Sequence, residues 1–223
     1  MTWVKICGIT NLEDALVAVD AGVDALGFVF YEKSPRKVDV ETAREIVAKL
    51  PEKVEKVGLF VDQTVDEVHD TVCRAGFTAV QLHGNVAGRV WKDPRPSLEC
   101  MGVSKVIPVV AGSALENGGM SISEGARAKV FAVLIDSLGD GEVGGTGTKF
   151  DWQATRGMVQ HLGLIVPVIV AGGLNASNVP EAMELFHPFG VDVASGVEAS
   201  PGKKDPQKVR AFVQAVRTAE KRV

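Results

Sequence analysis

The sequence predicts an α/β protein, and among α/β folds it predicts the (β/α)8 barrel, also called the TIM barrel. Eight short apolar runs recur from one end of the 223-residue chain to the other. Most are near-continuous runs of Val, Ile, Leu or Phe, which is typical of parallel strands buried on both faces. Helical patterns separate them, and a barrel of this kind usually has about 250 residues. An open, doubly wound sheet has the same local pattern and is the alternative.

The strand candidates lie at residues 3–7, 24–30, 54–61, 78–82, 103–110, 130–136, 166–171 and 191–194. The clearest helical patterns lie at residues 11–21, 39–50, 64–75, 175–186 and 205–220, with Asn11, Asp39, Thr64 and Asn175 as expected N-caps. The stretches 85–102 and 111–128 show no clear pattern, so the fourth and fifth helices are assigned there only by their place in the count.

Three segments carry the signal for the end of a helix and the start of a strand. They are DAGVDAL (20–26), RAGFTAV (74–80) and PFGVDVA (188–194), and each has a glycine shortly before an apolar run. Glycine is the usual residue just past a helix end, because it adopts positive φ without a Cβ clash. No linker or change in composition divides the chain, so we expect one domain over residues 1–223.

Composition excludes several classes of function. The chain is 46% hydrophobic and 23% charged with a net charge of −4, which is ordinary for a soluble globular protein and argues against nucleic acid or an anionic membrane as a partner. No apolar run reaches the roughly 18 residues of a membrane span, and no signal-peptide pattern is present.

The cysteines and histidines indicate neither a disulfide framework nor a metal site. Cys7, Cys73 and Cys100 are odd in number and widely spaced, which fits a reducing cytoplasm. The four histidines have no metal-ligand spacing with each other or with a cysteine, so we expect no metal.

Two chemically useful side chains stand at predicted strand ends, where barrels of this class carry their chemistry. Cys7 ends the first strand, and Lys5 lies two residues earlier and therefore on the same face. A nearby cation gives the thiol a route to a lowered pKa. Asp136 ends the apolar sixth strand, where partial desolvation would raise its pKa and suit a general acid. A small buried thiol and an aspartate that caps its own loop are the structural alternatives.

Two further candidates could contact a substrate. Arg36 lies in the loop after the second strand, next to Pro35, and arginine can grip a carboxylate or phosphate with two parallel hydrogen bonds. A solvated surface arginine is the alternative. His83 ends the fourth strand and could contact substrate or hold a neighbouring side chain.

The loops after strands seven and eight predict a phosphate site. Each has small residues at the strand end: Gly172 and Gly173 in one loop, Ser195 and Gly196 in the other. Small residues let backbone N–H groups approach an anion closely, and these two loops frequently bind phosphate in this fold. The segment GDGEVG (139–144) matches a dinucleotide-binding pattern, but no helix follows at once and its two carboxylates would repel a pyrophosphate. We expect residues 138–149 to form a long mobile loop over the site.

Eight motifs at these strand ends together resemble one enzyme family. They are VKICGIT (4–10), GFVFYEKSPRKV (27–38), VGLFVD (57–62), VQLHG (80–84), LIDS (134–137), GGTGTKFDW (144–152), VAGGLN (170–175) and VDVASGVE (191–198). The set resembles phosphoribosylanthranilate isomerase, an enzyme of tryptophan biosynthesis. The motifs cover nearly the whole chain in order, so the resemblance is specific although no single motif would be.

The resemblance implies an Amadori rearrangement of N-(5′-phosphoribosyl)anthranilate to 1-(2-carboxyphenylamino)-1-deoxyribulose 5-phosphate. It implies Cys7 as the general base and Asp136 as the general acid, with Arg36 on the anthranilate carboxylate and the last two loops on the phosphate. Lys5 and His83 complete the expected substrate-binding set. No cofactor is implied, the partner is a small phosphorylated substrate, and the protein is expected to be a cytoplasmic monomer or homodimer.

Two other functions remain as alternatives at this stage. One is another phosphate-binding barrel enzyme, such as a sugar-phosphate isomerase or epimerase, or a relative of indole-glycerol-phosphate synthase. The other is a barrel that binds a phosphorylated ligand without catalysis. The first would show metal ligands or a catalytic Lys/Glu set at its strand ends, and neither is evident. The second is opposed by the presence of both Cys7 and Asp136.

Overall fold

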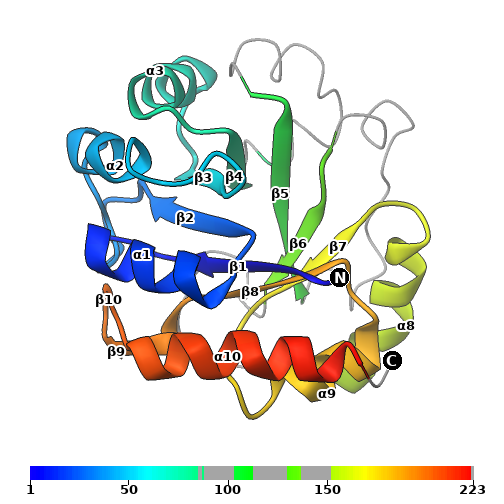
Figure 1. Ribbon diagram of the computed structural model, residues 1–223. Helices are drawn as coiled ribbons and strands as arrows, with labels where there is room; N and C mark the ends of the chain where they lie inside the picture. Colours follow the sequence, from blue (N-terminus) through cyan, green and yellow to red (C-terminus); the bar gives the residue numbers. More distant parts are fainter. Residues whose placement is uncertain (85–86, 88–102, 113–129, 137–151, 222–223) are drawn as a thin grey trace.

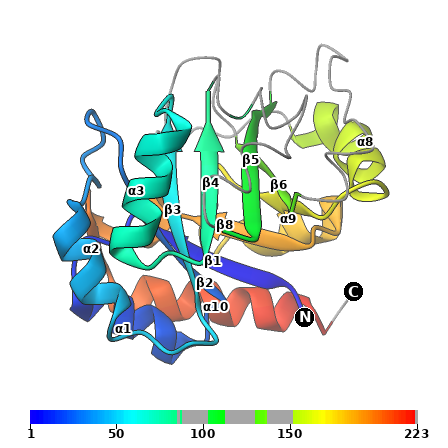
Figure 2. The same ribbon diagram turned by 90° about the horizontal axis from the view of Figure 1, so that it is seen from above.

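Eight parallel strands close into a barrel in the order β1 to β8 (Figures 1 and 2). The computed structural model describes residues 1–84, 87, 103–112, 130–136 and 152–221. The strands are β1 (Trp3–Cys7), β2 (Ala25–Val29), β3 (Glu55–Val61), β4 (Ala79–His83), β5 (Lys105–Ala111), β6 (Val133–Asp136), β7 (Val168–Val170) and β8 (Gly190–Val193). Because β1 pairs with both β2 and β8, the sheet has no open edge. The predicted barrel is therefore confirmed, and the open sheet is wrong.

Helices cover the outside of this barrel. They are α1 (Leu12–Ala21), α2 (Val40–Val47), α3 (Val65–Ala75), α8 (Trp152–Gly163), α9 (Val179–Phe186) and α10 (Pro206–Ala219). The sequence patterns missed α8. The helices expected at 85–102 and 111–128 lie outside the described residues except for 87, 111 and 112, and residue 111 belongs to β5. The loop 138–149 lies wholly outside the described residues. After β8 the chain forms a short 3-10 turn (Ser195–Val197) and a hairpin of β9 (Glu198–Ser200) and β10 (Lys203–Lys204), which was also not predicted.

The predicted starts of α1, α2 and α3 are correct, and the predicted start of α9 is wrong. Side chains of Asn11, Asp39 and Thr64 accept hydrogen bonds from the first turns of α1, α2 and α3. Asn175 does not cap α9, because its side chain instead accepts from the backbone of Ser177, and the helix begins four residues later. The residue that ends α9 is His187, with a φ of 47°.

Glycines follow two of the three helices for which the sequence predicted them. Gly22 and Gly76 have φ values of 88° and 76° and end α1 and α3. Gly190 instead opens β8, where a Cβ would lie 2.8 Å from the carbonyl oxygen of Trp3. Glycine is therefore needed at this third position for close packing of two strands and not for a helix end.

Strand residues alternate between two apolar environments, and this alternation places the site. Val4 and Ile6 of β1 pack in the large cluster shared with the helices. The intervening Lys5 and Cys7 therefore face the barrel interior. The interior holds one cluster that includes Ala25, Val57, Ile107 and Leu134, and a smaller one of Cys7, Val29 and Leu59. Cys7 therefore belongs to the last interior layer, at the carboxyl ends of the strands.

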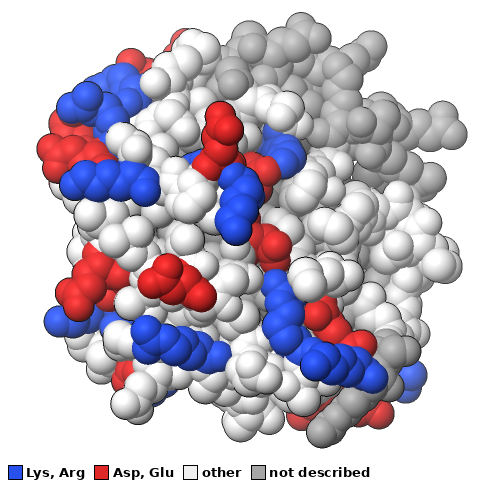
Figure 3. Space-filling model, viewed as in Figure 1, with Lys and Arg blue, Asp and Glu red and all other residues white. Residues whose placement is uncertain are grey.

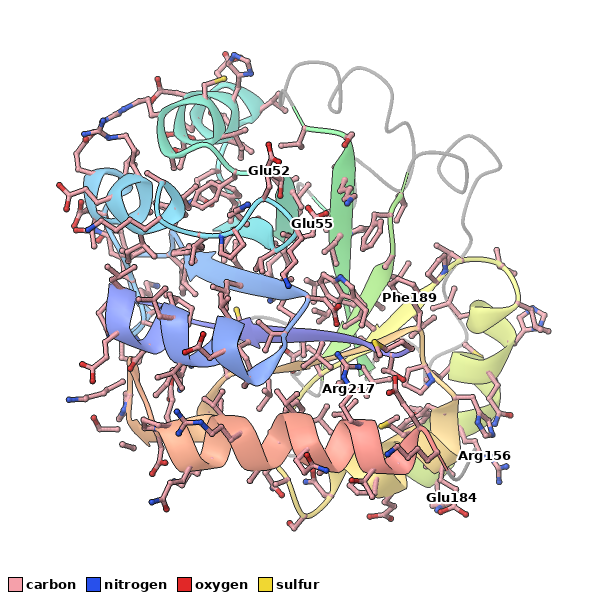
Figure 4. All side chains as sticks on the ribbon, viewed as in Figure 1. Glu52, Glu55, Arg156, Glu184, Phe189 and Arg217 are labelled. Carbon is pink, nitrogen blue, oxygen red and sulfur yellow. The ribbon has the colours of Figure 1, made fainter. Side chains whose placement is uncertain are left out.

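The last helix is tied to the start of the barrel. Arg217 of α10 is labelled in Figure 4. It donates to the carbonyl oxygen of Thr2 at 2.6 Å and to the carboxylate of Asp24 at 3.2 Å. Basic and acidic side chains are interspersed over the visible surface rather than segregated by sign (Figure 3). None of the described helices has the length and apolar composition of a membrane span.

Candidate active site

The carboxyl ends of β1, β4, β6, β7 and β8 converge on one pocket. Among its lining residues are six of the residues that the sequence singled out, namely Cys7, His83, Asp136, Gly172, Gly173 and Ser195. The pocket also has Leu59, Gln81 and Asp192 in its lining. The predicted thiol and carboxyl, which are 129 positions apart in the sequence, therefore face one cavity.

Lys5 lies beneath this pocket, wholly buried, and is paired with a residue that sequence reasoning missed. Its Nζ lies 2.9 Å from Oδ1 of Asp192, its register partner on β8, and it also hydrogen-bonds to Cys7. Burial lowers the pKa of Lys5, but the charges of Asp192 and Cys7 outweigh burial and leave that pKa above its ordinary value. Lys5 is therefore a cation held against the thiol.

The expected lowering of the Cys7 pKa is wrong. The thiol is 5% exposed, and burial raises its pKa, because the thiolate loses its hydration. The charges of Lys5 and Lys204 act in the opposite direction, whereas the charge of Asp192 adds to the effect of burial. The net pKa of Cys7 lies above its ordinary value, since Asp192 offsets part of the effect of Lys5.

Asp136 ends β6 beside Ala111 of β5 and is 8% exposed. Most of the strand residues around it are apolar, as the sequence predicted: Val133, Leu134 and Ile135 are all fully buried. Removal of water around a carboxyl disfavours its ionised form. A raised pKa for Asp136 stays a prediction, and the burial of its side chain is the observation that supports it.

His83 is a buried, neutral member of the pocket. Burial, assisted by the charge of Lys5 and opposed by that of Asp62, lowers the pKa of His83 to about 4. Its Nε2 lies 3.1 Å from the side-chain nitrogen of Gln81. A neutral imidazole at pH 7 suits a hydrogen-bonding role toward a substrate or a neighbour better than a charge-pairing role.

His83 should make the fold less stable in mild acid. In the unfolded chain the His83 side chain binds a proton below about pH 6.5. In the folded protein it binds one only below about pH 4. Stability therefore falls as the pH falls through this window. The unfolding free energy of the wild type should fall between pH 7 and pH 5. In His83→Gln we expect this fall to be smaller by about 2 kcal/mol. Urea unfolding of both proteins at the two pH values measures this, and an identical loss in both would contradict it.

Arg36 is not a solvated surface residue, and the edge of its guanidinium formed by Nε and Nη2 is not available to a bound anion. It is 7% exposed, and its Nε and Nη2 each lie 2.8 Å from a carboxylate oxygen of Glu198. Its stem packs over Gly8, whose φ of 78° and lack of Cβ make room for it. The two parallel hydrogen bonds that the sequence predicted for a substrate are therefore made to Glu198. Nη1 of Arg36 donates no hydrogen bond to the described residues. Arg36 is also not among the lining residues of the pocket.

The two small-residue loops after β7 and β8 pack against each other. Gly172 and Gly173 have φ values of 84° and 63°. A Cβ on Gly196 would overlap the carbonyl oxygen of Leu174, so glycine is required for the loops to touch. These loops line one side of the pocket through Gly172, Gly173 and Ser195, whereas Gly196 lies behind them.

Comparison with known proteins identifies the family. The family model for N-(5′-phosphoribosyl)anthranilate isomerase matches residues 4–215. The chain belongs to this family. A relative named N-(5′-phosphoribosyl)anthranilate isomerase from Pelobacter propionicus is 42% identical over 96% of this chain and 95% of its own. The enzyme of the same name from Citrifermentans bemidjiense is 44% identical over 96% of each chain.

Solved structures of the isomerase family share the barrel. One describes monomers of the dimeric phosphoribosylanthranilate isomerase of Thermotoga maritima, with a TM-score of 0.79 and 37% identity over 98% of this chain and 100% of that one. Another is a phosphoribosylanthranilate isomerase in complex with reduced 1-(o-carboxyphenylamino)-1-deoxyribulose 5-phosphate, with a TM-score of 0.75 and 35% identity over 98% of this chain and 100% of that one. The resemblance noted in the sequence is therefore confirmed.

Sequence reasoning missed four buried polar residues around this isomerase pocket. Asp192 and Glu198 lay inside a motif that was recognised, and a carboxylate in the apolar run VDVA was a usable signal. Gln81 lay in VQLHG, and its Oε1 is buried without a hydrogen bond from the described residues. Lys204, in the exposed-looking stretch PGKKD, gave no signal at all, although it is 1% exposed.

Proposed function

We propose that this chain catalyses the Amadori rearrangement of N-(5′-phosphoribosyl)anthranilate, with Cys7 as general base and Asp136 as general acid. One observation carries the proposal: a thiol and a carboxyl line one pocket of a barrel that belongs to the isomerase family. They stand on β1 and β6, and could therefore address different atoms of one substrate.

The reaction needs both groups in turn. Asp136 donates a proton to the ribose ring oxygen, so that the ring opens and a protonated Schiff base forms at C1. Cys7, as thiolate, then removes the proton from C2, and the electrons of that C–H bond move toward the imine nitrogen. The resulting enolamine becomes the ketone when C1 gains a proton and the C2 hydroxyl group loses one. The imine itself takes up the electrons, so the proposal includes no cofactor and no metal.

The charges near the pocket support an anionic substrate. Arg36 and protonated Lys204 carry two positive charges, and Glu198, which pairs with both, carries one negative charge. Burial lowers the pKa of Lys204, and the charge of Glu198 opposes this effect. These three side chains alone carry one net positive charge when Lys204 is protonated, and a carboxylate bound at the outer end of Arg36 would balance it. We propose that the anthranilate carboxylate binds to the end of the Arg36 guanidinium that includes Nη1, since the other edge is held by Glu198.

Removal of this guanidinium should weaken binding more than chemistry. The contact would stabilise ground state and transition state about equally, so Arg36→Met should raise KM about 10- to 100-fold, from the roughly 1.5–3 kcal/mol of a hydrogen bond to a charged group, and change kcat much less. Steady-state kinetics measures the split. Arg44→Met, which removes an exposed arginine, is the control. An unchanged KM in Arg36→Met would show that Arg36 does not touch substrate.

The phosphate group is assigned to the loops after β7 and β8. Gly172, Gly173 and Ser195 line the pocket, and small residues there let backbone N–H groups approach an anion closely. Gly196 would contribute by letting the two loops pack together. The related protein bound to a reduced deoxyribulose 5-phosphate compound supports a phosphorylated ligand for this family. We propose that His83 and Lys5 complete the substrate-binding set, His83 in the wall of the pocket and Lys5 through its contact with Cys7.

The remaining proposals concern the molecule as a whole. We propose a single domain over residues 1–223 that works in the cytoplasm as a monomer or homodimer. The Thermotoga maritima relative is described as dimeric, which supports the second state. Light scattering of the purified protein distinguishes the two.

Genetic complementation tests the function in a cell. A bacterial strain that lacks this isomerase cannot grow without tryptophan. Expression of the wild-type chain should restore growth, and expression of Cys7→Ser should not. Failure of the wild-type chain to restore growth, despite soluble expression, would contradict the proposal.

A further inference from the structure

The hairpin that follows β8 carries a buried carboxylate with two cationic partners. Glu198 of β9 accepts two hydrogen bonds from Arg36, both of 2.8 Å, and lies 2.9 Å from Nζ of Lys204 on β10. Glu198 is 6% exposed and Lys204 is 1% exposed. Hydrogen bonds to Arg36 and Lys204 outweigh the effect of burial and hold the pKa of Glu198 below its ordinary value. The carboxylate is therefore ionised and fixed from two sides.

Lys204 continues this chain of contacts to the strand that bears the proposed base. Its Nζ donates to the carbonyl oxygen of Cys7 at 2.6 Å and to that of Ala194 at 3.2 Å. Cys7 is the last residue of β1, and Ala194 directly follows β8, the neighbour of β1 in the barrel. The backbone N–H of Lys204 donates to Asp14 of α1 at 2.7 Å, so the hairpin is also anchored to the first helix.

A buried charge cluster of this kind is costly unless every member has its partners. Surface ion pairs of this chain, such as Lys37 with Glu32, need no such arrangement because water solvates them. Glu198 connects Arg36, 162 positions earlier, with Lys204, only six positions later. The cluster therefore links the loop after β2, the end of β1 and the end of β8 through three side chains.

We propose that Glu198 and Lys204 are positioning residues for the isomerase reaction: Glu198 fixes the guanidinium of Arg36 so that its outer end faces the substrate carboxylate, and Lys204 fixes the strand end that presents Cys7. This inference rests on the proposed function, because the KM measurement that tests it requires turnover of the substrate. The β9–β10 hairpin does not line the pocket. It would nevertheless position Arg36 and Cys7, which act on different parts of the substrate.

A double-mutant cycle tests the Glu198 half. Glu198→Gln keeps the size of the side chain but turns an N–H group toward the donors of Arg36, so the fork is lost. We expect Glu198→Gln to raise KM about tenfold in the wild-type background and to have almost no further effect on KM in the Arg36→Met background. Glu32→Gln, an exposed glutamate in an ion pair with Lys37, is the matched control. An unchanged KM, or an equal further rise in the Arg36→Met background, would overturn the assignment.

A thiol titration tests the Lys204 half without any turnover. In a variant lacking Cys73 and Cys100, ultraviolet absorbance reports ionisation of Cys7 alone. Lys204→Met should raise the pKa of Cys7, because it removes one of the two cations that favour the thiolate. Lys203→Met, an exposed lysine of the same hairpin, should leave it unchanged. Equal titration curves in all three proteins would overturn this half, whereas an inactive wild type would refute the proposed function and leave this readout intact.

Discussion

Replacement of Cys7 by serine should reduce kcat by about a hundredfold to ten-thousandfold, the usual contribution of a general base. Cys7 is the side chain in the pocket that is proposed to take the C2 proton, and a serine hydroxyl is far too weakly acidic to be present as an anion. The substitution leaves the size of the side chain nearly unchanged in an interior layer formed with Val29 and Leu59. Substrate binding and the thermal unfolding midpoint should therefore stay close to the wild-type values.

Cys73→Ser is the matched control for this experiment, because Cys73 is exposed on α3 and is not among the residues that line the pocket. It should have wild-type kinetics. A near-normal kcat in Cys7→Ser would remove Cys7 from the mechanism, whatever the pocket geometry.

Asp136→Asn should have an effect of similar size, about a hundredfold to ten-thousandfold on kcat, because the amide cannot deliver a proton to the ring oxygen. The two side chains are close in shape, so KM should change little. Asp70→Asn, on the exposed face of α3, is the control. Wild-type turnover in Asp136→Asn would show that another group, or water, protonates the ring oxygen.

The pH profile follows from the same two groups. A thiolate base and a carboxylic acid together give a bell-shaped kcat/KM. Because burial raises the pKa of Cys7, the alkaline limb should report ionisation of Cys7 and the acidic limb Asp136. The active form is then the minor one, with the thiol ionised and the carboxyl protonated. A Cys7 pKa below its ordinary value, found by thiol titration, would contradict this assignment.

The barrel and most of the pocket could be predicted because short segments of the sequence indicate the strands and their ends. Buried parallel strands are apolar along their whole length, and the ends of such strands meet at one face of the barrel. Cys7, His83 and Asp136 each end a strand, so a correct strand count was enough to bring them together. Helix starts at Asn11, Asp39 and Thr64 were correct because a capping side chain acts within its own turn.

The parts that could not be predicted depend on contacts between distant segments. Nothing near Arg36 in sequence indicates that Glu198 occupies two of its nitrogens, and nothing near Cys7 indicates the contact of Lys204 with its carbonyl. The prediction of a lowered Cys7 pKa was wrong for the same reason. Lys5 was visible two residues away, whereas the opposing Asp192 lies 187 positions from Lys5 and burial is a property of the whole fold.

The most direct test of the account is a fluorescence assay of N-(5′-phosphoribosyl)anthranilate consumption by the purified protein, run beside Cys7→Ser and Asp136→Asn. The account predicts that the wild-type protein consumes the fluorescent substrate and yields 1-(2-carboxyphenylamino)-1-deoxyribulose 5-phosphate, and that each variant binds the substrate but turns it over at most at about a hundredth of the wild-type rate. A folded wild-type protein that leaves the substrate unchanged, or a variant that matches the wild-type rate, would contradict it.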